Sequence, residues 1–172
     1  MVLSHNKEFK MKQLLFTLII STFFSTYIIA QKDLTGLKSI IVKVELDENL
    51  EKEGYNSETI KTDTELELRL AHINVIDREQ YTSDNVNKTA TLYVNIMSFV
   101  KEIGYTYHIA LSTLEPVTVP RLDKDDYIAI TWGRSALGIT TGGYRGWQFI
   151  REAAKELVNE FLNDYLKDNP KN

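Results

Sequence analysis

The chain has 172 residues, no cysteine and a formal net charge of −4. This length gives room for one domain with a core of its own. The lack of cysteine excludes a disulfide framework, a thiolate metal site and a thiol nucleophile. The acidic balance argues against nucleic acid as a partner.

The first thirty residues have the order of a secretory signal peptide. Lysines at 7, 10 and 12 precede an apolar run over residues 14–30, which ends at the small residue Ala30. This order predicts a signal peptide over residues 1–30, cleaved after Ala30, and a single α+β domain over residues 31–172. Translation from Met1 or from Met11 would produce such a signal. We therefore expect an exported protein, periplasmic or extracellular.

An uncleaved anchor in the inner membrane is the alternative for this segment. Residues 14–30 approach the roughly 20 apolar residues that span a bilayer. Residues 1–30 contain three lysines and one glutamate, so 17 basic and 23 acidic side chains remain without them. The remaining chain has a net charge of −6.

The first elements of the domain follow a strand, helix, strand order. Residues 37–46 alternate and are rich in β-branched side chains, which predicts a strand. A helix is expected over residues 58–71, with Asn56 or Ser57 as its N-cap, followed by a short strand over residues 73–76. A right-handed crossover would place the two strands in parallel.

Two long alternating runs, residues 89–101 and 105–115, predict an antiparallel hairpin. A two-residue turn at Ile103 and Gly104 would place Val100 opposite Tyr107 and Phe99 opposite His108. One side of this hairpin is then nearly all apolar. The other side mixes apolar, aromatic and polar residues.

The last third of the chain predicts a strand, a loop and a long helix. Pro116 and Pro120 are expected to end the preceding strand, because proline cannot donate to a central ladder. Residues 127–134 read as the fifth strand, and the glycine-rich residues 133–146 read as a loop. An apolar stripe at helical spacing predicts a helix from about residue 144 or 147 to about 167.

The fold expected from these elements is α+β. It is a two-layer sandwich with a mixed sheet of four or five strands in the order β-α-β-β-β-β-α. Both helices, including the long C-terminal one, are expected on one face of the sheet.

The mixed side of the hairpin is the first candidate site. It is too apolar for open water and too polar for a sealed core, a composition found on binding surfaces. We expect it to bind an envelope protein, a peptide or a lipid, unless the final helix covers it or the fifth strand curls the sheet over it. Its predicted partner-binding residues are Tyr93, Met97, Phe99, His108 and Leu114.

The glycine-rich segment is the second candidate, for an anion held by Gly142, Gly143 and Arg145. Its spacing matches neither the dinucleotide fingerprint nor the P-loop. His72 and His108 stand in no metal-ligand or triad spacing. We therefore predict no catalytic residue, no metal and no cofactor.

Several residues spread over the domain resemble a group of small exported bacterial proteins of unknown function. They are Glu65, Leu68, Arg69, Ile73, Val75, the run 92–94, Thr131, Trp132, Gly138, the run 161–166 and Asn169. His72 stands where that group often has glycine. More loosely, the element order is similar to the N-terminal domain of TolB and to small envelope accessory lipoproteins. The resemblance implies a non-catalytic role in the envelope and transfers no catalytic residue.

The sequence thus predicts a non-catalytic, exported binding or accessory protein of the bacterial cell envelope. A small-ligand or anion binder acting through residues 133–146 is the first alternative. A small hydrolytic enzyme is the second.

Overall fold

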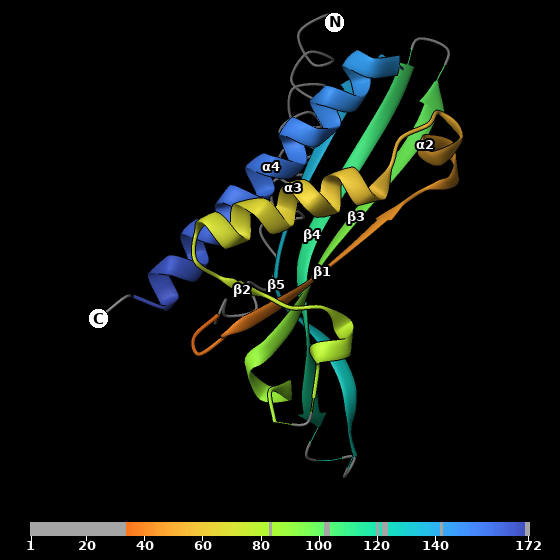
Figure 1. Cartoon of the computed structure of the whole chain (residues 1–172). Coiled ribbons are helices and arrows are strands. Elements are labelled where there is room, and N and C mark those ends of the chain that lie inside the picture. Colours follow the sequence, from red (N-terminus) through yellow and green to blue (C-terminus); the bar gives the residue numbers. More distant parts are fainter. Residues whose placement is uncertain are drawn as a thin grey trace, which may run out of the picture. The chain divides into compact units, whose positions relative to one another are not determined.

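A computed structural model describes residues 34–82, 84–101, 104–119, 121, 124–141 and 143–170. The signal segment predicted over residues 1–30 lies outside these residues. The described part forms one mixed five-stranded sheet in the order β2-β1-β3-β4-β5 (Figure 1). The strands are β1 (Ser39–Leu46), β2 (Asn74–Val75), β3 (Thr89–Lys101), β4 (Gly104–Val119) and β5 (Lys124–Thr140).

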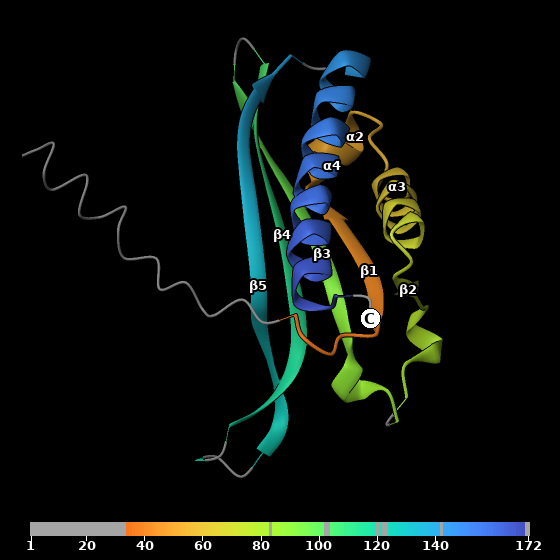
Figure 2. The same cartoon turned by 90° about the vertical axis from the view of Figure 1, so that its left-hand side faces the viewer.

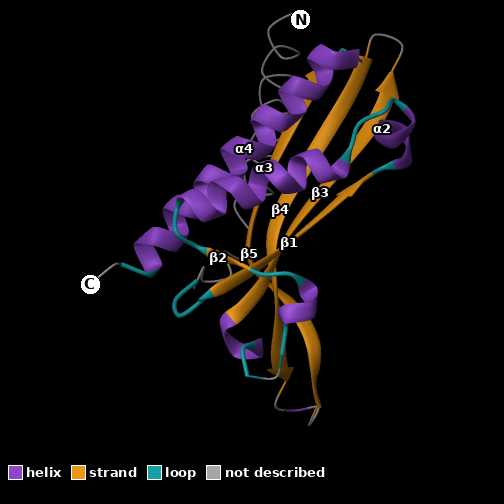
Figure 3. Cartoon of the chain, in the orientation of Figure 1, coloured by secondary structure: helices purple, strands orange, loops and turns teal. Residues whose placement is uncertain are grey.

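The helices α3 (Ser57–Leu70) and α4 (Gly143–Asp168) pack together on one face of this sheet, and no helix of the described residues lies on the other face (Figure 2). The predicted α+β sandwich with a long C-terminal helix is confirmed. Figure 3 also shows α2 (Glu48–Lys52), a short helix that was not predicted from the sequence. None of the helices in the described ranges has the length and apolar character needed to cross a membrane.

The strand pairing explains how the chain builds both a parallel and an antiparallel half. β1 pairs in parallel with β2, as predicted, and also with β3. β3, β4 and β5 then pair in antiparallel order. The sheet is therefore mixed, with β3 at its centre and β2 and β5 at its two edges.

Local signals set both ends of α3. The Asn56 side chain accepts a hydrogen bond from the Glu58 amide at 2.8 Å, which is an N-cap. At the other end, Ile73 N–H bonds the Leu68 carbonyl at 3.0 Å and His72 N–H bonds the Arg69 carbonyl at 2.9 Å. This is a Schellman motif, and its left-handed position is filled by His72 with φ 63°.

The register of the β3–β4 hairpin differs from the predicted one by two residues. Ser98 lies opposite Tyr107, and the last pair before the connection is Lys101 with Gly104. Met97, rather than Phe99, faces His108, and Phe99 faces Thr106. A shift of two residues keeps every side chain on its predicted face. The division into an apolar and a mixed side therefore survives.

β4 and β5 are both longer than predicted. β4 continues through Pro116 to Val119, and Pro116 lies opposite Ile128. The prediction that Pro116 ends this strand is wrong, because β3 stops pairing at Leu114 and β4 then has a neighbour on one side only. A missing amide is tolerated at such an edge. Figure 1 shows this two-stranded part projecting past the other strands.

The predicted loop over residues 133–146 is also largely wrong. Residues 133–140 continue β5 in register with β4, and residues from Gly143 onward belong to α4. The glycines in this segment allow close packing. A methyl group at Gly138 would collide with the Tyr107 ring, and one at Gly146 would collide with the Thr141 carbonyl.

The core lies between the sheet and the two helices. Trp132 of β5 packs edge-to-face on Phe161 of α4, with ring centroids 5.2 Å apart. The apolar stripe predicted for the last helix is confirmed by the buried residues of α4, which include Ile150, Ala154, Leu157, Val158 and Phe161.

Candidate functional site

The side of the sheet opposite α3 and α4, here called the outer face, is built from alternate residues of four strands. Side chains that lie directly opposite each other on paired strands share a face. The register thereby places two rows across β3, β4 and β5, each with a polar residue between two apolar ones, which are Phe99–Thr106–Ile139 and Met97–His108–Leu137. A third apolar group, Leu114 with Ile130 and Pro116 with Ile128, follows toward the other end.

All five predicted partner-binding residues lie on the outer face. Phe99 is 59 % exposed and Met97 is also exposed, so neither belongs to the core. Tyr93, His108 and Leu114 are half-buried among their sheet neighbours. The helices cover the opposite face, so the alternative that α4 seals this side does not hold (Figure 2).

Tyr93 belongs to a polar part of the outer face. Its hydroxyl donates a short hydrogen bond to Glu45, and Lys43 pairs with the same carboxylate at 2.6 Å and lies over the Tyr93 ring. The hydrogen bond to Glu45 is the main reason, with burial second, that the pKa of Tyr93 is raised to about 12. The polar groups of Tyr93, Glu45 and Lys43 therefore bind one another.

The most exposed apolar side chains of the outer face come from β5 and were missed by the sequence analysis. Leu137 is 73 % exposed and Ile139 is 77 % exposed. The signal was present as a period-two pattern at residues 137 and 139, but the density of glycine made the segment look like a loop. Leu137 and Ile139 are odd-numbered residues of β5. The register shift between Thr113 and Leu114 inserts one extra residue in β5, so that the even-numbered residues Ile130 and Ile128 also lie on the outer face.

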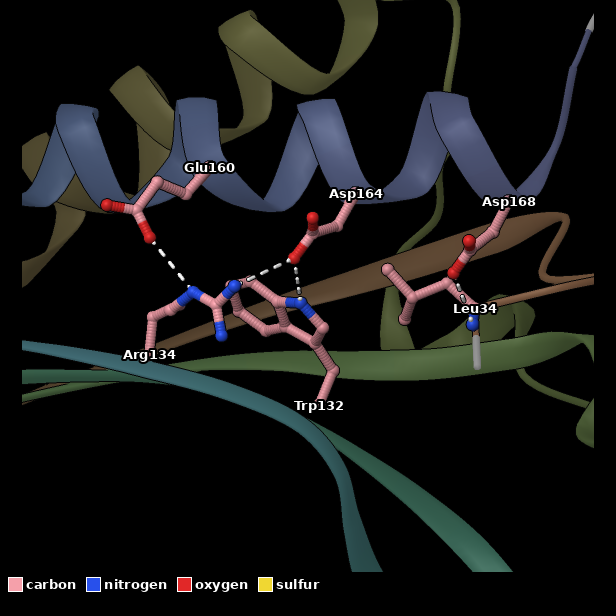
Figure 4. Close-up of polar contacts among 6 residues, drawn as sticks. All are labelled: Leu34, Trp132, Arg134, Glu160, Asp164 and Asp168. Carbon is pink, nitrogen blue, oxygen red and sulfur yellow. Dashed lines mark hydrogen bonds and ion pairs between the residues drawn. The ribbon is translucent and has the colours of Figure 1, made fainter. Parts of the chain in front are cut away.

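The inner side of β5 is fastened to α4. The indole N–H of Trp132 donates to Asp164 Oδ2 at 2.9 Å, and Arg134 bonds Asp164 and Glu160 at 3.2 and 3.0 Å (Figure 4). These contacts fix the inner face of β5 against α4 and leave its outer face toward solvent. The apolar outer residues of β5 are therefore presented on a fixed strand.

The second candidate site is only partly described. Gly142 lies outside the described residues. Gly143, with φ 78°, is the first residue of α4, and its carbonyl accepts a hydrogen bond from the Tyr55 hydroxyl at 3.0 Å. Arg145 is exposed in the first turn of α4. Anion binding at these residues stays a prediction. The loop on which that prediction was based is mostly strand and helix in the structure.

The structure does not bring the two histidines together. His72 ends α3 in the helix layer, whereas His108 lies in the middle of the outer face opposite Met97 and Leu137. Among the residues that the structure describes, no group of three or more acidic or histidine side chains could hold a metal ion. The charged side chains between α3 and α4 form ion pairs, Arg151 with Asp63 at 2.7 Å and Lys155 with Glu67 at 2.6 Å.

Two solved structures that resemble this chain are both distant from it in sequence. No family model and no curated protein matches the sequence. A homologue of a neuraminyllactose-binding hemagglutinin from Helicobacter pylori shares 10 % identity over 78 % of this chain and 85 % of its own, with a TM-score of 0.44. PelC from Paraburkholderia phytofirmans, solved as a dodecamer, shares 11 % identity over 77 % of this chain and 91 % of its own, with a TM-score of 0.45. Likenesses this distant assign the chain no activity, ligand or partner.

Proposed function

We propose that this chain is a non-catalytic, exported accessory protein of the bacterial cell envelope that binds a protein partner through the outer face of its sheet. The observation that carries the proposal is the exposure of large apolar side chains at alternating strand positions, Phe99, Leu137 and Ile139 above all. Soluble monomers rarely expose contiguous apolar surface of this kind unless something binds there.

Charge favours a protein over a lipid surface as the partner. Without residues 1–30 the chain has a net charge of −6, and membrane surfaces in bacteria and elsewhere carry anionic lipids. Peripheral proteins that bind such surfaces surround their apolar residues with lysine and arginine. On the outer face, Lys43 is paired with Glu45 and supplies no free positive charge.

Export is supported by the basic, apolar and small residues in order over residues 1–30. The non-catalytic part of the proposal is supported by the ordinary structural roles of the polar groups described above. They cap helices, pair strands or join α4 to the sheet.

A matched pair of double variants tests the proposal. Leu137→Ser with Ile139→Ser removes apolar surface from the outer face, and Leu66→Ser with Leu70→Ser removes it from α3, where these leucines are 53 % and 66 % exposed. The full chain and both variants are expressed in the native cell, and the proteins that co-purify from the envelope are quantified. We expect only the β5 variant to lose its partner. The proposal would be contradicted if both variants captured the same amount of partner protein. It would also be contradicted if the full chain co-purified with lipid vesicles and with no protein.

A further inference from the structure

The two edges of the sheet are built in opposite ways. β2 has two residues, and Asn74 at that edge is exposed, which is how natural sheets avoid unwanted pairing. β5 has 17 residues, and no strand among the described residues pairs with its second side. Such an edge presents a row of free backbone amides and carbonyls.

Only part of the β5 edge is protected. Irregularities in the β4–β5 register between residues 113 and 114 and between 117 and 119 disturb the half nearer Lys124. The half from Ser135 to Thr140 pairs with β4 without interruption and contains no proline and no charged residue. Arg134, just before it, is turned toward Glu160 and Asp164 on α4.

The side chains flanking this open segment define what could pair with it. On the outer side, Leu137 and Ile139 offer apolar neighbours to every second residue of an added strand. On the inner side, the Tyr107 hydroxyl reaches over Gly138, and Glu156 of α4 lies close enough to that hydroxyl to raise its pKa, after the larger effect of burial. Glu160 and Asp164 add two more carboxylates at successive turns of the same helix.

One carboxylate of this row, Glu156, is not matched by a positive charge from the described residues. Arg134 faces Glu160 and Asp164, and Glu156 has no ion-pair partner among the described residues. A strand added to β5 would therefore place its inward side chains beside the Glu156 carboxylate, which favours lysine or arginine at those positions.

Resting on the proposed function, we propose that residues 135–140 of β5 accept an extended segment of the partner as a sixth strand, and that this segment alternates apolar and basic residues. Main-chain hydrogen bonds supply affinity in this mode of recognition, and the alternating side chains supply specificity. The outer-face residues and the acidic side of α4 then act on the same bound strand.

A synthetic ten-residue peptide that alternates valine and lysine is the probe. It is added to the full chain, purified from the envelope of an expressing bacterium, and amide hydrogen exchange is followed by mass spectrometry. We expect slower exchange at residues 135–140 and unchanged exchange in β1. A peptide that alternates valine and glutamate should give no such protection. Protection elsewhere, or equal protection by both peptides, would overturn the inference.

N-methylated peptides test whether the backbone is what binds. Pairing with one edge uses the amides of every second peptide residue. Of two lysine peptides methylated on alternate amides in opposite phases, one should bind as the parent does and the other should lose binding. If both bind as the parent does, strand addition is wrong.

Protein variants separate this inference from the proposed function. Glu156→Gln should weaken binding of the lysine peptide about threefold, as expected for one partly exposed charge pair. Glu58→Gln, the same change on exposed α3, should not alter the binding of the peptide.

The envelope capture and the peptide experiment can give different answers. If the Leu137 and Ile139 variant loses its envelope partner while the peptide gives no protection, the inference of strand addition is overturned and the proposed function stands. If exchange at residues 135–140 instead slows with protein concentration alone, a second copy occupies the edge and the inference is overturned.

Discussion

Trp132 on β5 and Asp164 on α4 are joined by a hydrogen bond of 2.9 Å between the indole N–H and the carboxylate (Figure 4). The Trp132 side chain is almost fully buried, so this donor has no access to water. Asp164 also accepts from Arg134 at 3.2 Å. One carboxylate therefore fixes both the position of α4 and the strand that carries Leu137 and Ile139.

Removing this carboxylate should destabilise the fold more than breaking the neighbouring ion pair. We expect Asp164→Ala to lower the free energy of unfolding by about 2 kcal/mol, because it leaves a buried donor unsatisfied. Glu160→Ala should cost less than about 1 kcal/mol, since the pair of Glu160 with Arg134 is partly exposed. Urea unfolding measures both values, and equal losses would contradict this account of the contact.

His72 should be replaceable by glycine with a gain in stability. A left-handed residue with a Cβ costs about 1–2 kcal/mol, whereas the added freedom of glycine in the unfolded chain costs about 0.4–1 kcal/mol. We expect His72→Gly to raise the free energy of unfolding by roughly 0.5–1 kcal/mol. His72→Ala keeps the Cβ and should show no gain. A loss of stability with glycine would mean that the imidazole makes a contact that outweighs the backbone strain.

Asp47 should make the stability of the domain depend on acid pH. Its carboxylate accepts from the amides of Asn49 and Leu50, both at 3.0 Å, and from the amide and hydroxyl of Ser98. Burial alone would raise the pKa of Asp47, but these hydrogen bonds outweigh it and hold the pKa below its ordinary value. The stabilisation is therefore complete above the unfolded-state pKa and is lost as pH falls through the lower folded-state pKa.

The matching variant is Asp47→Asn, which keeps one acceptor oxygen and removes the charge. At neutral pH we expect it to be about 1–2 kcal/mol less stable than the original chain. The difference should begin to shrink as pH falls below about 4, where Asp47 of the unfolded chain becomes protonated, and should vanish below the lower folded-state pKa. Unfolding by urea at several pH values measures it. A difference that stays constant down to acid pH would show that the charge of Asp47 does not stabilise the fold.

Gly146 should not tolerate even a methyl group. A Cβ there would collide with the backbone carbonyl of Thr141, which cannot move aside as a flexible side chain can. We expect Gly146→Ala to cost about 2 kcal/mol, as overpacking of a close contact does. Gly133→Ala is the control, because its nearest neighbour would be 3.5 Å away. Similar thermal unfolding temperatures for the two variants would argue against a tight fit of α4 on Thr141.

The fold was predictable wherever one hydrophobic period dominated. The alternation in β3 and the helical stripe of α4 specified those elements, and an error of two residues in the hairpin turn left every face intact. The failures have local causes. Pro116 and Gly138 usually interrupt strands, yet Pro116 lies where β4 has one neighbour, and Gly138 lies where Tyr107 needs room.

The candidate site was only half predictable from the sequence. Phe99 and Met97 lie in a run whose alternation was clear, and the structure places both on the outer face. Leu137 and Ile139 could not be assigned to that face, because their register depends on pairing with β4 and on the bulge near Thr113. The open edge of β5 depends on the order of strands in the sheet, which no local pattern in the sequence specifies.

Photo-crosslinking in the native cell tests whether the outer face of the sheet is the surface that binds the partner. A photoreactive amino acid is placed, one position at a time, at Leu137 and Ile139 on the outer face and at Leu66 and Leu70 on α3, all of which are exposed. We expect the two β5 positions to give a covalent adduct with the same envelope protein and the two α3 positions to give none. Adducts from the α3 positions, with none from Leu137 or Ile139, would contradict this expectation.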